Sequence, residues 1–536
     1  MEIKALAFLK SEYILLFDER YTLCLTSAEQ MQMNIPDTET APASHNVFSF
    51  NRLRQNLTVA LFFLVIPLLP FRYFPYGPFS CLSLYPLLLI GILNADLLFR
   101  LLWKNKLLFY VFLGIVAWAI WGVISLLLFS GTAISVGTHI TLFISTGITL
   151  SAVYLFLSSY YLLPSGSAPT VLYRSITTSL LICAAYNILE FLHFNQCGFA
   201  TAFLKKAIYF FSEVCINGSW SPPEIWPQPR LRSFFPEPGY YAMFLLFAAL
   251  FYALNCVYSP VKNMLKHIVC NGVLFFLSIL LLIGTKSTMG GLSLLAGVLC
   301  FSVLYALYWK RQNSTQRWHN GILCVILLLS TVLTLNFQRG GFFAANQAIS
   351  IVKNAAEQEQ DKEKESKEKK HPAPQAGGSI KTRMLHFYAS CNLIAERPFF
   401  GCGTGNYIPE MHRALTELPE KTSEIQRWIK QKTPCGPSIL AVLCVVYGIP
   451  GALLFFSFAL VPLVFYVRKN ACKTDYRTTL FAIPLLFAMG ISMNGTGGME
   501  LAAYLLLIPP VLFLLESLQK QECITCDAVT SGAENG

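Results

Sequence analysis

Residues Leu107–Phe129 read LLFYVFLGIVAWAIWGVISLLLF. This stretch carries no charged side chain, and as a helix it is long enough to cross a hydrocarbon core of about 30 Å. Apolar runs of similar length recur along almost the whole chain, which has 536 residues and is 54% hydrophobic and 13% charged. No soluble domain of this size buries so many apolar side chains. The sequence therefore predicts an all-α, polytopic membrane protein of about twelve transmembrane helices.

The expected spans divide the chain into five parts. A cytoplasmic N-terminal segment, 1–56, precedes spans one to nine in 57–337. One large extracytoplasmic loop, 338–434, follows. The segment 435–518 then holds a re-entrant or interfacial helix and spans ten to twelve, and a cytoplasmic tail, 519–536, ends the chain. The spans are expected at Leu57–Phe74, Cys81–Leu101, Leu107–Phe129, Gly137–Leu163, Val171–Phe194, Gly239–Tyr258, Ile268–Gly284, Gly290–Trp309, Gly321–Phe337, Ile449–Val467, Thr478–Asn494 and Leu501–Leu518.

Basic residues in short loops predict the orientation, because Lys and Arg are retained on the cytoplasmic side. Clusters of them follow only even-numbered spans, so we expect both termini inside and the large loop outside. The net charge of +11 then reflects topology, and no basic stripe interleaved with aromatic residues indicates nucleic-acid binding. The clusters are Lys104 and Lys106; Lys262 and Lys266; Lys310, Arg311 and Arg317; and Arg468, Lys469, Lys473 and Arg477.

The large loop contains a charged insert and then a stretch with candidate site residues. Alternating acids and lysines in 357–371 predict a solvated helix or a disordered insert. From Arg383, the sequence RMLHFYASCNLIAERPFFG predicts an amphipathic helix along the membrane surface. Arg383 and His386 are three residues apart and share a face of it, and Arg397 lies near its end. The plain alternative is that these are interfacial side chains reaching toward water.

The loop continues into a glycine-rich stretch, AERPFFGCGTGNY at Ala395–Tyr407. Glycines at alternate positions, Gly401, Gly403 and Gly405, allow backbone N–H groups to approach an anion. A nucleotide-binding loop would need a strand before it and a Lys-Ser/Thr pair after it, and neither is present. We therefore expect a tight turn that packs the loop against the membrane face.

Two further motifs fall on the same outer face. PQPRLRSFFPEPGYYAMF, from Pro227 to Phe244, carries Arg230, Arg232 and Glu237 at the entrance of the sixth span. A carboxylate in the first turn of a helix also has a purely structural explanation in the helix dipole. GTKSTMGG, from Gly284, carries Lys286 between the seventh and eighth spans.

These cations lie on the side that membrane insertion disfavours, so they need an anionic partner. A pyrophosphate is the natural candidate, because arginine forks bind its oxygens bidentately and stabilise the charge that develops as it leaves. No Cys-x-x-Cys or His cluster has metal-ligand spacing, so we do not expect a zinc site. We also expect no cofactor.

Taken together, the motifs resemble those of the bacterial O-antigen ligase and polymerase family, integral-membrane glycosyltransferases that act on undecaprenyl-pyrophosphate-linked sugars. The resemblance covers about 176–465. It rests on RSFFPEPGYYA from Arg232, GTKSTMGGLSLL from Gly284, Arg383 with ERPFFGCGTGNY, and SILAVLCVVYGIPGALLFF from Ser438. Their order and their side of the membrane agree with the family.

The resemblance implies a glycosyltransferase C-like helical fold in the bacterial cytoplasmic membrane, with an outer-face cavity roofed by the large loop. It implies that Arg232 and Arg383 bind the donor pyrophosphate, with Lys286 beside them. Arg230 and Arg397 are further candidates for this anion. The general base stays open between Glu237 and His386.

Within that family, the Glu237-Pro238 pair resembles polymerases. Ligases carry a His-Asn before the helix that follows the loop, whereas TPCGPSIL, from Thr433, has no His. We therefore expect a polymerase of lipid-linked repeat units for O-antigen, capsule or exopolysaccharide. Its implied partners are membrane lipids, a chain-length regulator and a flippase, without nucleic acid. The alternatives are an O-antigen ligase, a lipid-linked oligosaccharide transporter, and a non-catalytic scaffold.

Overall fold

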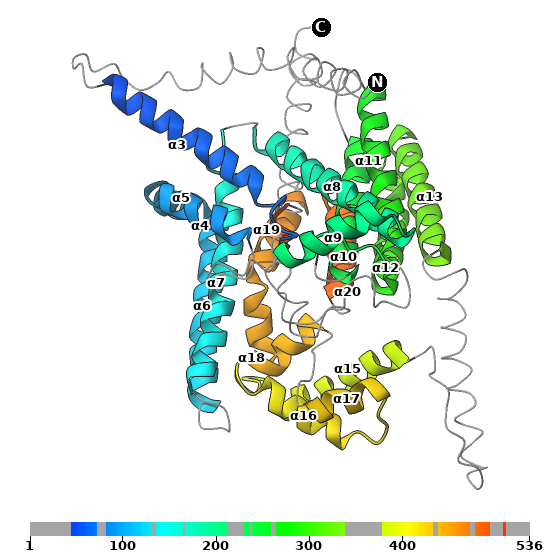
Figure 1. Ribbon diagram of the computed structural model, residues 1–536. Helices are drawn as coiled ribbons and strands as arrows, with labels where there is room; N and C mark the ends of the chain where they lie inside the picture. The colour runs from blue at the N-terminus through cyan, green and yellow to red at the C-terminus, as the bar shows by residue number, and fades with distance from the viewer. Residues whose placement is uncertain are drawn as a thin grey trace.

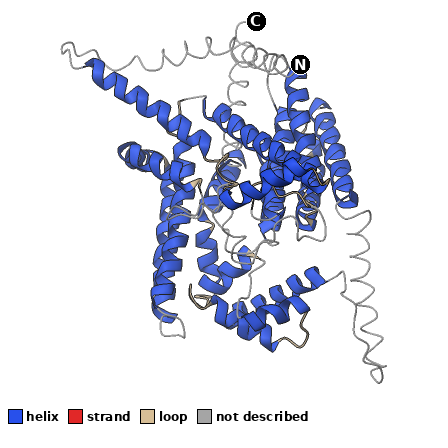
Figure 2. Cartoon of the chain, viewed as in Figure 1, coloured by secondary structure: helices blue, strands red, loops and turns tan. Residues whose placement is uncertain are grey.

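A computed structural model describes residues 44–71, 82–129, 136–164, 167–211, 230–235, 238–258, 264–312, 314–337, 378–431, 438–471, 477–493 and 507–510. Within these ranges every regular element is a helix (Figure 2). Seven of the described helices are long and apolar enough to cross a membrane, or up to eight if one bent pair counts as a single span. The prediction of an all-α polytopic membrane protein is confirmed. The charged insert 357–371 and the tail 519–536 lie outside the described residues.

The helices follow one another along the chain as Figure 1 labels them. They are α3 (Ser44–Leu64), α4 (Leu84–Leu93), α5 (Ala95–Lys104), α6 (Lys106–Phe129), α7 (Val136–Tyr160), α8 (Ser167–Phe194), α9 (Gly198–Phe211), α10 (Pro238–Tyr258), α11 (Met264–Gly284), α12 (Thr288–Leu307), the 3₁₀ turn η3 (Trp309–Arg311), α13 (Ser314–Phe337), α15 (Gly378–Glu396), α16 (Tyr407–Glu417), α17 (Ser423–Gln431), α18 (Ile439–Phe455), α19 (Ser457–Ala471) and α20 (Arg477–Met493).

The first two expected spans differ from the structure. Helix α3 is Ser44–Leu64, whereas the sequence predicted Leu57–Phe74. Pro67 and Pro70 explain the early end, because proline has no N–H for a helical hydrogen bond and restricts the residue before it.

The second expected span, Cys81–Leu101, is not one straight helix, because α4 and α5 meet at 83°. Asn94 lies at the bend. Its Nδ2 donates to Ile90 O (3.1 Å) and to Thr58 Oγ1 (2.9 Å), and its Oδ1 accepts from Arg54 Nε (3.0 Å). Arg54 also pairs with Asp96 at the start of α5. Side chains from α3 therefore hold the bend.

Helix α18 also departs from the expected span, Ile449–Val467, because it begins at Ile439 and contains a break at Gly448, where φ is +72°. Pro450 follows and offers no N–H to the carbonyl of Val446. That carbonyl accepts from Gly403 N instead (2.9 Å), and Ile449 N donates to Pro398 O (2.8 Å). The hydrogen bonds lost at the break are replaced by bonds to the large loop.

The described side chains form two packed clusters. A large apolar core joins α3, α4, α6–α8, α10–α13 and α18–α20, and α10 is the most enclosed span in it. A smaller core joins α15, α16 and α17 around Met411, Leu415 and Ile425, and it also contains Val445 of α18. Figure 1 shows α15–α17 together at the lower end, with α18 leading from them into the bundle.

Apolar side chains also cover the outside of the bundle. Ile120 and Leu127 on α6, Leu307 on α12 and Leu329 on α13 are exposed. Soluble proteins rarely expose so much contiguous apolar surface, so these faces are suited to hydrocarbon.

Candidate active site

Two of the motifs singled out in the sequence lie side by side at one end of α10, α11 and α12. Leu231 N donates to Gly284 O at 2.9 Å. Arg230 Nε donates to Thr285 O at 3.0 Å. The segments that carry the arginines of the first motif and the lysine of the second, Lys286, are thereby brought together although more than fifty residues separate them in the chain.

The turn that carries Lys286 is fixed by its own hydrogen bonds. Lys286 is half-buried and has a left-handed backbone, with φ of +48°. Before it, Thr285 Oγ1 donates to Leu282 O (2.7 Å) and accepts from Ser287 N (3.2 Å). After it, Ser287 Oγ caps α12 by accepting from Gly290 N (3.3 Å). The lysine is therefore presented by a rigid turn between two spans.

A buried acid on α8 meets the arginine motif. Glu190 Oε2 accepts from Arg232 N (3.2 Å) and from Ser233 N (3.0 Å). Glu190 is 1% exposed and Arg232 is 8% exposed, and no other described Asp, Glu, Lys or Arg is as buried as these two. Sequence reasoning gave Glu190 no role in the site. The signal was an acid near the end of an expected membrane span.

Arg383 and His386 lie on α15, in the smaller cluster. Arg383 is half-buried, whereas His386 is fully enclosed. His386 Nε2 lies 3.3 Å from Tyr407 Oη, and its ring meets the Trp428 ring edge-on with centroids 6.0 Å apart. Burial lowers the pKa of His386 to about 4. A buried imidazole of such low basicity is poorly suited to act as general base. The catalytic role of His386 stays a prediction, and its burial argues against it.

The apolar residues of α15 divide between two faces. Leu393 is buried against α16 and α17, together with Ala389. Met384, Phe387 and Tyr388 are exposed on the other side. The helix is therefore apolar outward as well as inward.

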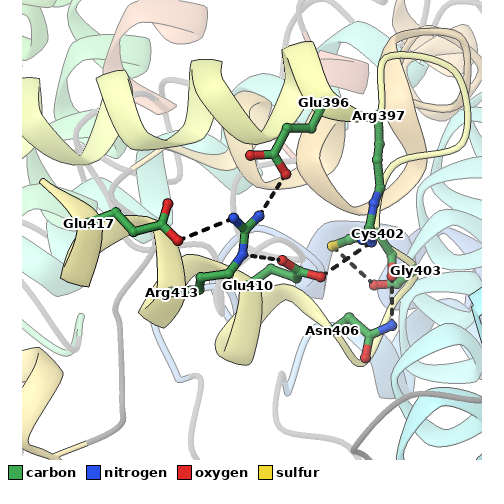
Figure 3. Close-up of polar contacts among 8 residues, drawn as sticks. All are labelled: Glu396, Arg397, Cys402, Gly403, Asn406, Glu410, Arg413 and Glu417. Carbon is green, nitrogen blue, oxygen red and sulfur yellow. Dashed lines mark hydrogen bonds and ion pairs between the residues drawn. The ribbon is translucent and has the colours of Figure 1, made fainter.

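Arg397 takes part in an ion-pair network shown in Figure 3. Its Nη1 lies 3.3 Å from Glu410 Oε1. Arg413 reaches Glu410 (3.1 Å), Glu396 (2.6 Å) and Glu417 (3.4 Å) from the same region of α16. Arg397, which the sequence predicts as a ligand for an anion, has a protein carboxylate as a partner in the structure. Neither Glu410 nor Arg413 was among the residues predicted for the site.

The glycine-rich stretch forms a turn against the break in α18. Cys402 N donates to Val445 O (2.8 Å), beside the bond from Gly403 to Val446. Gly401 has φ of +67°, and a Cβ there would lie 2.5 Å from Val445 O, so only glycine fits. Asn406 Nδ2 closes the turn on Cys402 O at 2.7 Å (Figure 3).

Two membrane helices hold the same turn from the other side. Gly405 N donates to His139 Nδ1 on α7 (2.8 Å), and Thr404 Oγ1 donates to His139 O (3.1 Å). Ser125 Oγ on α6 donates to Phe400 O (2.9 Å). The loop is thus fastened to α6, α7 and α18. Neither His139 nor Ser125 carried a signal in the sequence, because each meets the turn across more than 260 residues.

The candidate residues therefore fall into two sets. Arg230, Arg232 and Lys286 lie in the bundle, and the others that the structure describes lie in or beside the loop helices. Glu237 lies outside the described residues.

This fold defines the class, an integral membrane protein with a helical loop unit clamped onto its bundle. Residues 273–456 match the family model described as O-antigen ligase. That match confirms the resemblance to the O-antigen ligase and polymerase family, and its range includes Lys286, Arg383 and the glycine turn. A comparison with curated proteins gives no match.

Proposed function

We propose that this protein polymerises undecaprenyl-pyrophosphate-linked oligosaccharide repeat units at the outer face of the bacterial cytoplasmic membrane. The family match supports a role in the assembly of O-antigen or a related polysaccharide, with lipid-linked glycan as substrate. The observation that carries the proposal is the junction of the two basic motifs, where the segment with Arg230 and Arg232 pairs with the turn that holds Lys286.

In the proposed reaction, a hydroxyl of the acceptor sugar attacks the anomeric carbon of the donor glycan. The new C–O bond forms as the bond to the pyrophosphate breaks, with inversion at that carbon. The hydroxyl proton passes to a base, for which Glu237 is the better candidate because His386 is enclosed. Arg232 and Lys286 stabilise the departing pyrophosphate, since arginine presents a fork of N–H donors to its oxygens.

Arg383 is the proposed second arginine for this pyrophosphate. Its half-buried position on α15 and its place within the family match support the role. The exposed Met384, Phe387 and Tyr388 on the same helix offer an apolar surface suited to a polyprenyl carrier. Arg397 has Glu410 as its partner, so we assign it to the structure of the loop.

The orientation with both termini cytoplasmic, and association with a flippase and a chain-length regulator, remain parts of this proposal. The second candidate function is a ligase that transfers finished glycan, which the description of the family model favours. The missing His in Thr433–Leu440 favours a polymerase.

Deletion of the gene separates the two. For a polymerase, the cells should accumulate lipid-linked single repeat units or a surface glycan capped at one unit. Normal-length polymer that stays on the carrier lipid, with only its transfer to the final anchor blocked, would instead identify a ligase.

A further inference from the structure

The buried carboxylate of Glu190 needs an explanation. It lies on α8, one of the candidate membrane spans, and a charged group inside a span is costly unless it has partners. The partners that the structure gives it are two backbone N–H groups, of Arg232 and Ser233, and the charge of Arg232 itself. The carboxylate of Glu190 therefore binds the turn that contains Arg232.

That turn has an unusual backbone. Ser233 adopts φ of +55°, a region that residues other than glycine rarely occupy. Its N–H and that of Arg232 point to one carboxylate oxygen, so Glu190 supplies the acceptor that the turn itself does not. The conformation that precedes α10 is held by a side chain from another span.

The contact belongs to a polar stripe along α8. Cys183, Asn187 and Glu190 are spaced four and three residues apart, which places them on one helix face. Cys183 O accepts from Ser233 Oγ (3.4 Å), and Asn187 Nδ2 donates to Tyr241 Oη on α10. Cys183 and Glu190 thus engage the segment that carries Arg232, whereas Asn187 engages α10.

We propose that Glu190 is a positioning residue for Arg232, which fixes the height and direction of the arginine toward the donor pyrophosphate. This inference rests on the proposed function. An arginine side chain that is already held in place loses less conformational entropy when the substrate binds. A displacement of a binding group by about 1 Å lowers the rate about 10²-fold.

The test uses the full chain purified in lipid nanodiscs, with a synthetic polyprenyl-pyrophosphate-linked repeat unit as the substrate. We expect Glu190→Ala to lower kcat/KM about 10²-fold. Glu190→Gln keeps an acceptor oxygen at the same place, so it should retain most of the activity. Asn187→Ala removes a neighbouring contact of the same stripe and serves as the matched control for helix packing.

Two results distinguish positioning from a merely structural role. First, Glu190→Ala combined with Arg232→Lys should lose little more activity than Arg232→Lys alone, because both act through one arginine. Second, gel filtration and thermal unfolding of Glu190→Gln should match those of the wild-type protein. Additive losses in the double variant, or a Glu190→Gln protein that folds normally but is as inactive as Glu190→Ala, would overturn the inference. Failure of the wild-type protein to polymerise would instead overturn the proposed function.

Discussion

Glu190 on α8 and Arg232 in the segment before α10 are separated in the chain by α9, yet the carboxylate of Glu190 accepts a hydrogen bond from the backbone N–H of Arg232 at 3.2 Å. Both side chains are buried. The carboxylate also interacts with the charge of Arg232, so we expect a change at Glu190 to alter the position of this arginine. The pair ties α8 to the entrance of α10, where the basic motif lies.

The guanidinium forks of Arg232 and Arg383 are the first features to test. Lysine keeps the charge but loses the bidentate geometry, so either Arg→Lys variant should reduce polymer formation about 10²-fold at normal protein level. Arg413→Lys is the matched control, because Arg413 lies in the same loop unit but pairs with three glutamates. Full activity in both Arg232→Lys and Arg383→Lys would make these arginines structural.

The enclosed imidazole of His386 predicts a pH dependence of stability. Its pKa falls from 6.5 to about 4 on folding, so below pH 6.5 the unfolded chain binds a proton that the folded protein does not. The free energy of unfolding should therefore fall as the pH drops through this window, by about 2 kcal/mol at pH 5. Thermal unfolding at pH 7.5 and pH 5 should show this loss in the wild-type protein.

His386→Gln should make that pH-dependent loss smaller, since glutamine does not titrate. The same variant should keep its activity at neutral pH if the histidine is structural. An unchanged pH dependence, or a stable variant without activity, would contradict this reading of His386.

The break in α18 predicts a large effect of a single methyl group. A Cβ at Gly448 would lie 2.0 Å from Phe399 O, and φ there is +72°. Gly448→Ala should cost on the order of 1–3 kcal/mol or more and should loosen the loop from the bundle. Limited proteolysis in the loop, together with the thermal midpoint, would measure both effects.

Gly272→Ala on α11 is the control, because its added Cβ would have no atom within 4 Å apart from its chain neighbours and the backbone of its own helix. It should be neutral or slightly stabilising. Equal behaviour of the two variants would contradict the close approach at Gly448.

Apolar length predicted the helices well where a span is straight, as for Leu107–Phe129, which is α6 apart from one residue. Apolar length did not predict the helix bends and breaks that depend on side chains or loops from other parts of the chain. The 83° bend at Asn94 depends on contacts with Thr58 and Arg54 of α3. The break at Gly448 depends on the loop turn. Hydropathy describes how favourably a segment transfers from water to lipid, and it carries no information about such hydrogen bonds.

Only part of the candidate site was predictable, because the sequence shows which residues are charged but not which residues they contact. Arg230, Arg232 and Lys286 were predicted as site residues because they are expected on the side of the membrane where Lys and Arg are disfavoured. The structure brings their segments together. The partners of these residues could not be found in the same way. Glu190 and Glu410 are acids within helices, and only their position in space connects them to arginines.

The central claim is that this chain joins repeat units at the expense of a polyprenyl-pyrophosphate bond. The most direct measurement incubates the purified protein in nanodiscs with a single defined lipid-linked repeat unit, and follows glycan length and released polyprenyl pyrophosphate together. We predict a ladder of lipid-linked polymer, one pyrophosphate released for each unit added, and loss of both signals in Arg232→Lys. Donor that stays one unit long, while the wild-type protein is folded and transfers preformed polymer to a separate acceptor, would contradict the account.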